Sequence, residues 1–248
     1  MLSIDVNKLS IRPGLRALDI GCGSGRHTAA IARYNGVQVI GADINVADVI
    51  EAKKRLLFQE RLEGKHGRWG LLAAGIHRLP FTDNFFDLIV CSEILEHIPD
   101  HRKAVAEAVR VLKPGGHMVV SVPRFFPERI CWALSREYHT ADNGHLRIYR
   151  KNELVRLLEG SGLKKWASHY AHSLHSPYWW LKCLTGPNRK DVRVVNLYHD
   201  LLTWDIMKRP WITRFLDSLL NPVLGKSLVL YLRKVKTEDW RPKVKNET

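Results

Sequence analysis

The chain has 248 residues, 45% of them hydrophobic and 26% charged, and its formal net charge at pH 7 is +14. This length fits one large α/β domain with a sizeable core, which excludes a small domain that depends on disulfides or a metal for stability. The positive charge favours an anionic partner, such as nucleic acid, an acidic membrane surface or an anionic substrate, but solubility explains it equally well.

The spacing of the cysteines and the hydropathy of the chain exclude further classes of protein. The four cysteines, at positions 22, 91, 131 and 183, form no Cys-x-x-Cys pair, so we expect neither a zinc knuckle nor a disulfide framework. Residues 1–13 have no apolar core of signal-peptide length, and no run of 18 apolar residues occurs. We therefore expect a cytoplasmic protein in a reducing compartment.

Residues 15–33 predict a strand, a glycine turn and a helix. The apolar run 15–20 suits a buried strand, and residues 28–33 suit a helix. Between them an acid is followed by three alternating glycines: Asp19, Gly21, Gly23 and Gly25. Such a turn lets a ligand lie on the backbone at the start of a helix. A nicotinamide or flavin site would need a third glycine at position 26, where the chain has Arg26.

A second apolar run, residues 37–42, ends at Asp43. In a βαβ nucleotide site an acid about 20 residues past the glycines accepts the ribose hydroxyls, so Asp43 is the ribose candidate. The alternative is a cap for the next helix, for which Asn45 is better placed.

Residues 69–73 and 85–91 predict the third and fourth strands, the fourth fully buried because its apolar run does not alternate. The fourth strand is followed by a polar cluster: Ser92, Glu93, Glu96 and His97. Ligands of an open parallel sheet bind at the carboxyl ends of the strands, so we expect this cluster to lie beside Asp19 and Asp43.

A helix over residues 100–112, the segment Lys113-Pro114-Gly115-Gly116 and a fifth strand over 117–122 complete a familiar pattern. With the glycine motif, residues 14–165 resemble class I S-adenosylmethionine (SAM) methyltransferases of methyltransferase type 11, typified by the ubiquinone O-methyltransferases. The resemblance implies an α/β fold with a doubly wound, Rossmann-like sheet of seven mostly parallel strands. It also implies SAM as the cofactor.

The resemblance also implies the cofactor site. The expected cofactor-binding residues are Asp19, Gly21, Cys22, Gly23, Gly25, Asp43, Ile44, Gly75, Ile76 and Ser92. In this family an acid commonly binds the adenine amine, but here Gly75 holds its place. We therefore expect backbone groups near Gly75 and Ile76 to hold the adenine.

In ubiquinone-type relatives a Glu-x-x-Glu-His run is associated with a divalent cation. Glu93, Glu96 and His97 match it residue for residue. The alternative is a polar helix start without a metal, and we expect no bound metal.

The family places a His-x-Arg segment near the methyl acceptor, and His145 stands in that segment here. Methyl transfer requires in-line positioning of the nucleophile and removal of its proton, and a histidine suits a phenol or enol oxygen. His145 is therefore the first candidate for the catalytic base, followed by His97 and Glu93; the alternative for His145 is a structural role. An apolar helix running from residue 125 through Tyr138 suggests a lid over the substrate.

Residues 164–170 and 227–235 predict the last two strands, separated by an unusually long insertion. The expected organisation is a core over 1–171, an aromatic-rich cap over 172–225, a last strand over 226–235 and a polar tail over 236–248. His169, His172 and His175 would share one face of a helix, a weak metal candidate.

Residues 211–220 carry an apolar stripe that must be buried against something. One option is packing on the edge of the protein's own sheet. The other is contact with an anionic membrane, with Trp204 and Trp211 at headgroup level. In that case Lys208, Arg209 and Arg214 would meet the lipid, and the protein would be peripheral to the membrane.

The sequence thus predicts an enzyme that transfers a methyl group from SAM to an apolar small-molecule or lipid-like acceptor, at oxygen. An RNA methyltransferase is the second hypothesis, supported by charge alone. Methylation of the exocyclic adenine amine is excluded, because the Asn/Asp/Ser-Pro-Pro-aromatic run typical of such enzymes does not follow the fourth strand. A SAM-binding protein without catalysis is the third hypothesis, motivated by Gly75.

Overall fold

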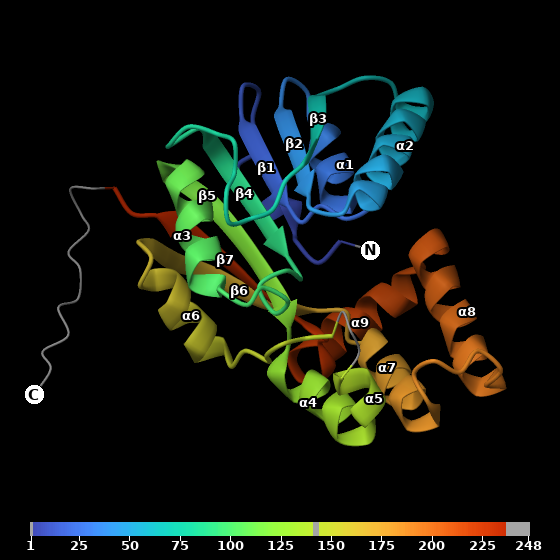
Figure 1. Cartoon of the computed structure of the whole chain (residues 1–248). Coiled ribbons are helices and arrows are strands. Elements are labelled where there is room, and N and C mark those ends of the chain that lie inside the picture. The colour runs from blue at the N-terminus through green and yellow to red at the C-terminus, as the bar shows by residue number, and fades with distance from the viewer. Residues whose placement is uncertain (1, 141–143, 237–248) are drawn as a thin grey trace, which may run out of the picture.

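A seven-stranded sheet forms the centre of the molecule (Figure 1). The structure is a computed structural model that describes residues 2–140 and 144–236, so the predicted polar tail lies outside these residues except for Lys236. The strand order is β3-β2-β1-β4-β5-β7-β6. β7 runs antiparallel to both of its neighbours, and the other pairs are parallel. The predicted doubly wound α/β fold is confirmed.

The strands are β1 (Arg16–Ile20), β2 (Gln38–Asp43), β3 (Arg68–Ala73), β4 (Phe86–Ser92), β5 (Leu112–Pro123), β6 (Leu163–Ala171) and β7 (Ser227–Lys234). The helices that accompany the sheet are α1 (Arg26–Ala32), α2 (Val46–Glu63), α3 (His101–Val111) and α6 (Lys151–Glu159), and a short 3-10 helix spans Val6–Lys8. Beyond the carboxyl end of β5 lie α4 (Phe125–Leu134) and α5 (Arg136–His139). Between β6 and β7 the chain forms α7 (His175–Thr185), α8 (Arg193–Lys208) and α9 (Trp211–Leu224).

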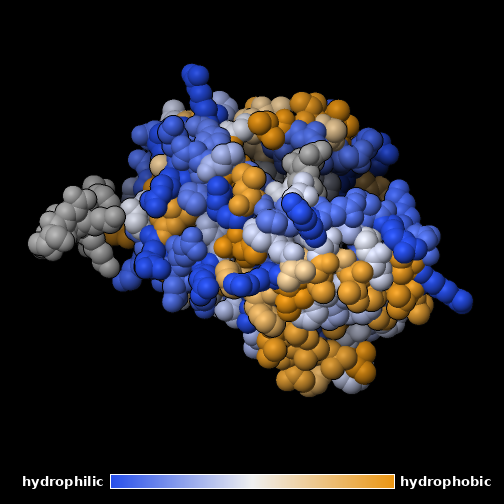
Figure 2. All heavy atoms as spheres, turned by 60° about the horizontal axis from the view of Figure 1, so that its bottom comes forward, coloured by the Kyte–Doolittle hydropathy of each residue, from blue (hydrophilic) through white to orange (hydrophobic). Residues whose placement is uncertain are grey.

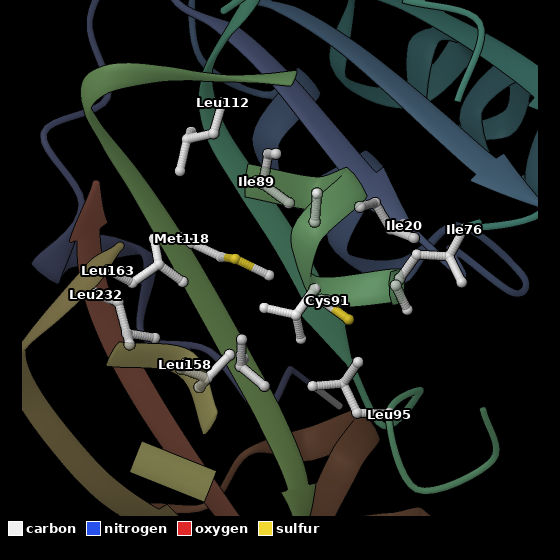
Figure 3. Packing of buried hydrophobic residues seen from close by; sticks show 14 of the residues in the cluster. Ile20, Ile76, Ile89, Cys91, Leu95, Leu112, Met118, Leu158, Leu163 and Leu232 are labelled. Carbon is white, nitrogen blue, oxygen red and sulfur yellow. The ribbon is translucent and has the colours of Figure 1, made fainter. Parts of the chain in front are cut away.

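Successive residues of each central strand point to opposite faces, so the apolar runs supply two cores. In β4, Ile89 and Cys91 join the core under α3 and α6, whereas Leu88 and Val90 join the core under α1 and α2. Figure 3 shows the first of these cores, where Met118 of β5 lies among the labelled side chains. Burial on both faces explains why the strands read as continuous apolar runs rather than alternating ones.

Two boundaries differ from the prediction. β5 begins at Leu112 rather than at residue 117, because Leu112 already pairs with Phe86 across an irregularity in the β4 ladder. The helix expected to run from residue 125 through Tyr138 is divided into α4 and α5 at Ser135. Ser135 has an extended backbone, and its hydroxyl caps α5 by accepting a hydrogen bond from the Tyr138 N–H.

The three histidines of the predicted helical face do not share a helix. His169 lies in β6, His172 follows the strand with a φ of 69°, and His175 begins α7. The imidazoles of His169 and His172 instead bond to Ser3. Among the helices of residues 2–140 and 144–236, none combines the length and hydropathy that a membrane span requires.

Two buried histidines make the fold sensitive to acid. Burial, assisted by the charge of Arg26, lowers the pKa of His27 on α1 to about 3. Burial and the nearby charge of Lys226 lower the pKa of His175 to about 4. Both groups are therefore neutral in the folded protein at pH 7.

We expect the free energy of unfolding to fall by about 2 kcal/mol between pH 7 and pH 5. The unfolded chain protonates these histidines near the ordinary pKa of 6.5, whereas the folded chain does so only at about 3 and 4, so acid favours unfolding. Asp19 opposes the effect below pH 6, because burial raises its pKa to about 6. Urea denaturation at the two pH values measures the change, and His27→Leu should reduce it. An unfolding free energy that is equal at both pH values would show that the two histidines do not govern the acid sensitivity of the fold.

Candidate active site

The glycine turn after β1 is open at one glycine and closed at another. At Gly23, with a φ of 50°, an added Cβ would meet no atom within 4 Å, so this backbone is accessible to a ligand. At Gly21, an added Cβ would lie 2.0 Å from the Ile94 Cδ1 atom, so the loop after β4 lies directly against the turn. Gly25 is needed for packing, since an added Cβ would lie 2.9 Å from the Cβ of Ala52 on α2.

Asp19 lies at the end of β1 and is 1% exposed. Its Oδ2 atom accepts hydrogen bonds from the Thr28 N–H at 2.9 Å and from the Thr28 hydroxyl at 2.7 Å. Its Oδ1 atom is buried and has no hydrogen-bond partner within the described part of the chain. Burial raises the pKa of Asp19 to about 6, and the Thr28 hydrogen bonds oppose this. Thr28, which fixes the carboxylate to the start of α1, was not among the site residues predicted from the sequence.

Asp43 joins the end of β2 to the glycine turn. Its Oδ2 atom accepts a hydrogen bond from the Gly23 N–H at 2.8 Å, and its Oδ1 atom accepts one from the Asn45 N–H at 2.9 Å. The cap of α2 is the Asn45 side chain, as predicted, which accepts a hydrogen bond from the Ala47 N–H at 3.0 Å. The N–H groups of Cys22 and Gly25 donate to carbonyls within the turn region, so these two donors are used inside the protein.

Ile44 and Gly75 form an apolar surface next to Asp43. The Ile44 side chain is 79% exposed, although it follows a buried strand. A Cβ added to Gly75 would lie 3.5 Å from Ile44 Cδ1, so the two residues are adjacent. The Ile76 side chain is 5% exposed and belongs to the core, which leaves only its backbone for a ligand. An exposed apolar side chain beside a ribose candidate suits the face of a flat aromatic ring.

A chain of hydroxyls leads from the end of β4 to Glu93. Ser121 of β5 donates a hydrogen bond to the Glu93 Oε1 atom at 2.9 Å, so Ser92, at 2.8 Å, must donate to Ser121. Burial raises the pKa of Glu93, while the charge of Lys226 and the Ser121 hydrogen bond oppose this rise. Glu93 has a φ of 56°, a backbone conformation uncommon outside glycine.

His145 is bound to Glu128, a residue that was not predicted from the sequence. The His145 Nδ1 atom lies 2.6 Å from the Glu128 Oε1 atom, and Lys226 Nζ lies 3.7 Å from Oε2. Glu128 is 1% exposed; burial alone would raise its pKa, but His145 and Lys226 outweigh burial and hold the pKa below its ordinary value. A glutamate inside the mostly apolar and aromatic sequence of α4, where Arg129 is the other charged residue, was the available signal.

Glu96, His97 and His145 form a second group, with one potential ligand atom from each lying within 4.8 Å of the others. Glu96 is fully buried and neither carboxylate oxygen has a hydrogen-bond partner in the described ranges. Burial and the charge of Glu93 raise its pKa well above the ordinary value. The His97 pKa is lowered, by burial first and then by His145. One carboxylate and two imidazoles suit a divalent cation, and the triad includes His145 where the sequence suggested Glu93.

Comparison with known proteins identifies the domain. Residues 18–120 match the family described as methyltransferase domain. The ubiquinone/menaquinone biosynthesis C-methyltransferase UbiE of Vibrio cholerae is 39% identical over 131 residues, which are 52% of this chain and 48% of that protein. Cycloartenol-C-24-methyltransferase 1 of Oryza sativa is 30% identical over 156 residues, 63% of this chain and 40% of that protein. The chain thus spans about half or less of the length of these relatives.

The similarity to solved structures covers more of the chain than the sequence matches do. The solved structure of the cyclase SpnF has a TM-score of 0.62 at 21% identity, covering 93% of this chain and 79% of that one. Because a cyclase shares the fold, the architecture alone does not assign the reaction. Residues 18–120 thus match a methyltransferase domain, and the similar proteins support a class I SAM-dependent methyltransferase with SAM as its cofactor.

The residues at the glycine turn fit this cofactor. The open backbone at Gly23 leaves room for a ligand, and the unpartnered Asp19 Oδ1 atom lacks the donor that an ammonium group would supply. Asp43 would hold the ribose hydroxyls, and the exposed Ile44 side chain would cover one face of the adenine. At Gly75, where the family commonly has an adenine-binding acid, the neighbouring Ile44 side chain would offer this apolar contact instead.

We expect Asp43→Ala to weaken SAM binding by about 1.5 to 3 kcal/mol, the range for losing charged hydrogen bonds. The substitution removes the ribose acceptor and also releases the Gly23 N–H that Asp43 holds. Isothermal titration calorimetry with SAM measures the dissociation constant.

Glu51→Ala is the matched control, because Glu51 is an exposed acid on α2 that pairs only with Lys54 among the ion pairs of the described residues. It should leave the dissociation constant unchanged. A folded Asp43→Ala protein that binds SAM as tightly as the unsubstituted chain would count decisively against the cofactor assignment.

Proposed function

We propose that this chain transfers the methyl group of SAM to an apolar, lipid-like acceptor whose hydroxyl group is deprotonated by His145. The observation that carries the proposal is the 2.6 Å contact between His145 Nδ1 and Glu128 Oε1. A carboxylate only accepts hydrogen bonds, so the Nδ1 atom carries the imidazole proton and Nε2 is the nitrogen able to accept one. Glu128 thus orients the base and stabilises the imidazolium that forms.

SAM, when bound, supplies a methyl group on a positively charged sulfur, and the electron pair of the broken carbon–sulfur bond stays on that sulfur. The protein's residues supply position and a proton acceptor. The acceptor's proton moves to His145, the acceptor oxygen forms the new bond to carbon, and Lys226 helps keep Glu128 ionised. The contact between Ile94 and Gly21 brings the acceptor loop against the cofactor turn, as in-line transfer requires.

Aromatic side chains around His145 support an apolar acceptor. The Tyr138 ring lies 6.4 Å from the His145 ring, and the Trp179 ring of α7 lies 5.7 Å from Tyr138. α7 is tied to α4 by a hydrogen bond from the Trp180 indole N–H to the Pro127 carbonyl at 2.9 Å. These rings offer a face to a phenol or quinol better than to a sugar or phosphate.

A carbon atom of the acceptor is the second candidate for the atom that receives the methyl group. Oxygen follows directly from deprotonation by His145, but UbiE and the cycloartenol enzyme are both named C-methyltransferases. A phenolate or enolate carries nucleophilic character on its conjugated carbon as well as on its oxygen, so the same base serves both outcomes. Mass spectrometry and NMR of the methylated product distinguish them.

The RNA hypothesis would draw on the basic surface of the molecule. A cleft of about 1060 Å³ is lined by Lys164, Lys165, Trp166 and Arg233, among others. It also contains Gly115 and His117 from the first half of β5, whereas His145 belongs with the carboxyl ends of β4 and β5. The basic cleft is therefore remote from the base, and we favour the apolar acceptor.

We expect His145→Ala to leave SAM binding intact and to lower turnover by about 10²- to 10⁴-fold, the usual contribution of a general base. Glu128→Gln should lower turnover less, because the base remains but its orientation and charge stabilisation are weakened. Transfer of labelled methyl groups from SAM into lipid and small-molecule extracts measures the rates.

The control is His66→Ala, which changes an exposed histidine on the loop after α2. Normal turnover in His145→Ala would make His145 structural and His97 the next candidate. A protein that binds SAM in calorimetry but methylates nothing in lipid, small-molecule or RNA extracts would support the non-catalytic hypothesis instead.

A further inference from the structure

Helix α9 exposes its apolar face. Ile212, Phe215, Leu219 and Val223 follow one another at helical spacing and are 50%, 60%, 61% and 63% exposed. The helix contains no buried residue. An amphipathic helix ordinarily turns this stripe toward the core, whereas α9 contacts the sheet edge at β6 and leaves these four apolar residues exposed.

Polar contacts hold α9 in this orientation. The buried Ser173 donates its hydroxyl to Asp217 Oδ1 at 2.7 Å and its N–H to Asn221 Oδ1 at 3.0 Å. Arg214 pairs with Asp205 of α8, whose side chain is 3% exposed. Arg214 was predicted to meet lipid, and this is wrong, because the buried carboxylate draws its guanidinium inward.

Helix α8 buries Val195 and Leu202 but also exposes apolar residues. Val194, Leu197, Leu201 and Trp204 lie on one side at spacings of three and four and are between 45% and 70% exposed. Figure 2 shows hydrophobic residues gathered on the part of the molecule where Figure 1 places α7 to α9. An exposed apolar face of this size marks an interaction surface.

The turn between α8 and α9 combines apolar and basic side chains. Met207 and Trp211 are 76% and 78% exposed, and Lys208 and Arg209 stand between them. Residues 172–225 contain seven Lys and Arg against four Asp. Asp205 and Asp217 are engaged in the inward contacts, and Asp191 bonds Arg189, so the exposed charge of this segment is mainly positive.

We propose that the exposed faces of α8 and α9, with the turn between them, bind an anionic membrane surface. Apolar side chains would enter the boundary between headgroups and acyl chains, and Lys208 and Arg209 would meet lipid phosphates. A second copy of this chain would bring the same positive turn against itself, which disfavours self-association through this face. The proposal concerns surface chemistry alone, so it stands or falls separately from the proposed methyl transfer.

Vesicle co-sedimentation tests the proposal with phosphatidylcholine vesicles and with phosphatidylcholine–phosphatidylglycerol vesicles, at low and high salt. The unsubstituted chain should bind the anionic vesicles at low salt and should bind more weakly at high salt. Absence of binding to anionic vesicles at low salt would overturn the proposal.

Phe215→Glu with Leu219→Glu should reduce vesicle binding about tenfold or more, because two inserted side chains become charged. The matched control is Phe58→Glu with Leu62→Glu on α2, two residues at the same spacing that are 64% and 69% exposed. Both proteins should fold, since the substituted positions are exposed. Equal binding by the two double variants would overturn the assignment to α9.

Lys208→Ala with Arg209→Ala should weaken binding about fivefold for each charge removed. Lys164→Ala with Lys165→Ala, in the remote basic cleft, serves as the charge control.

Light scattering measures the oligomeric state of the protein and adds an independent readout. One outcome would assign this face to self-association and overturn the membrane proposal. In that outcome the unsubstituted chain is a dimer that does not bind vesicles, and the variant Phe215→Glu with Leu219→Glu is a monomer.

Discussion

The contact between Gly21 and Ile94 is the constraint on which the site depends. No side chain fits at Gly21, because Ile94 already occupies the space that a Cβ would take. The cofactor turn after β1 and the acceptor loop after β4 therefore share one wall. Neighbouring parallel strands make this possible, since their carboxyl ends emerge at the same edge of the sheet. Two segments far apart in the sequence, the turn after β1 and the loop after β4, therefore lie against each other.

Charge is distributed unevenly across the acceptor side. Three carboxyl groups lie there in the protein interior, and each has a different environment. Glu128 is paired with His145 and Lys226 and stays ionised, whereas Glu96 has no donor among the described residues and a strongly raised pKa. Pairs of acids whose environments push their pKa values apart are typical of catalytic sites. The fold thus provides one carboxylate, Glu128, for orienting a base and beside it an acid, Glu96, whose pKa is raised.

The insertion between β6 and β7 exposes many of its apolar residues, although Cys183, Val195 and Leu202 are buried. Polar contacts of Ser173 with Asp217 and of Asp205 with Arg214 lie inside the insertion. α7 of the same insertion contacts α4, the helix that carries Glu128. A surface suited to lipid and a base suited to a phenol are therefore parts of one continuous structure.

Local sequence determined most of the core. Apolar runs predicted the central strands β1, β4 and β5, because residues buried on both faces of a sheet must be apolar throughout, whereas the edge strand β6 is mostly half-buried. The three glycines predicted the turn, and Asn45 predicted the cap of α2, because both depend on the backbone within a few residues. Tertiary structure alone decided three features. Glu128 of α4 meets His145, the helix breaks at Ser135, and α9 exposes its apolar stripe. In α9 the sequence defined the stripe, but the contacts of Asp217 with Ser173 and of Arg214 with Asp205 in the preceding helix set its direction.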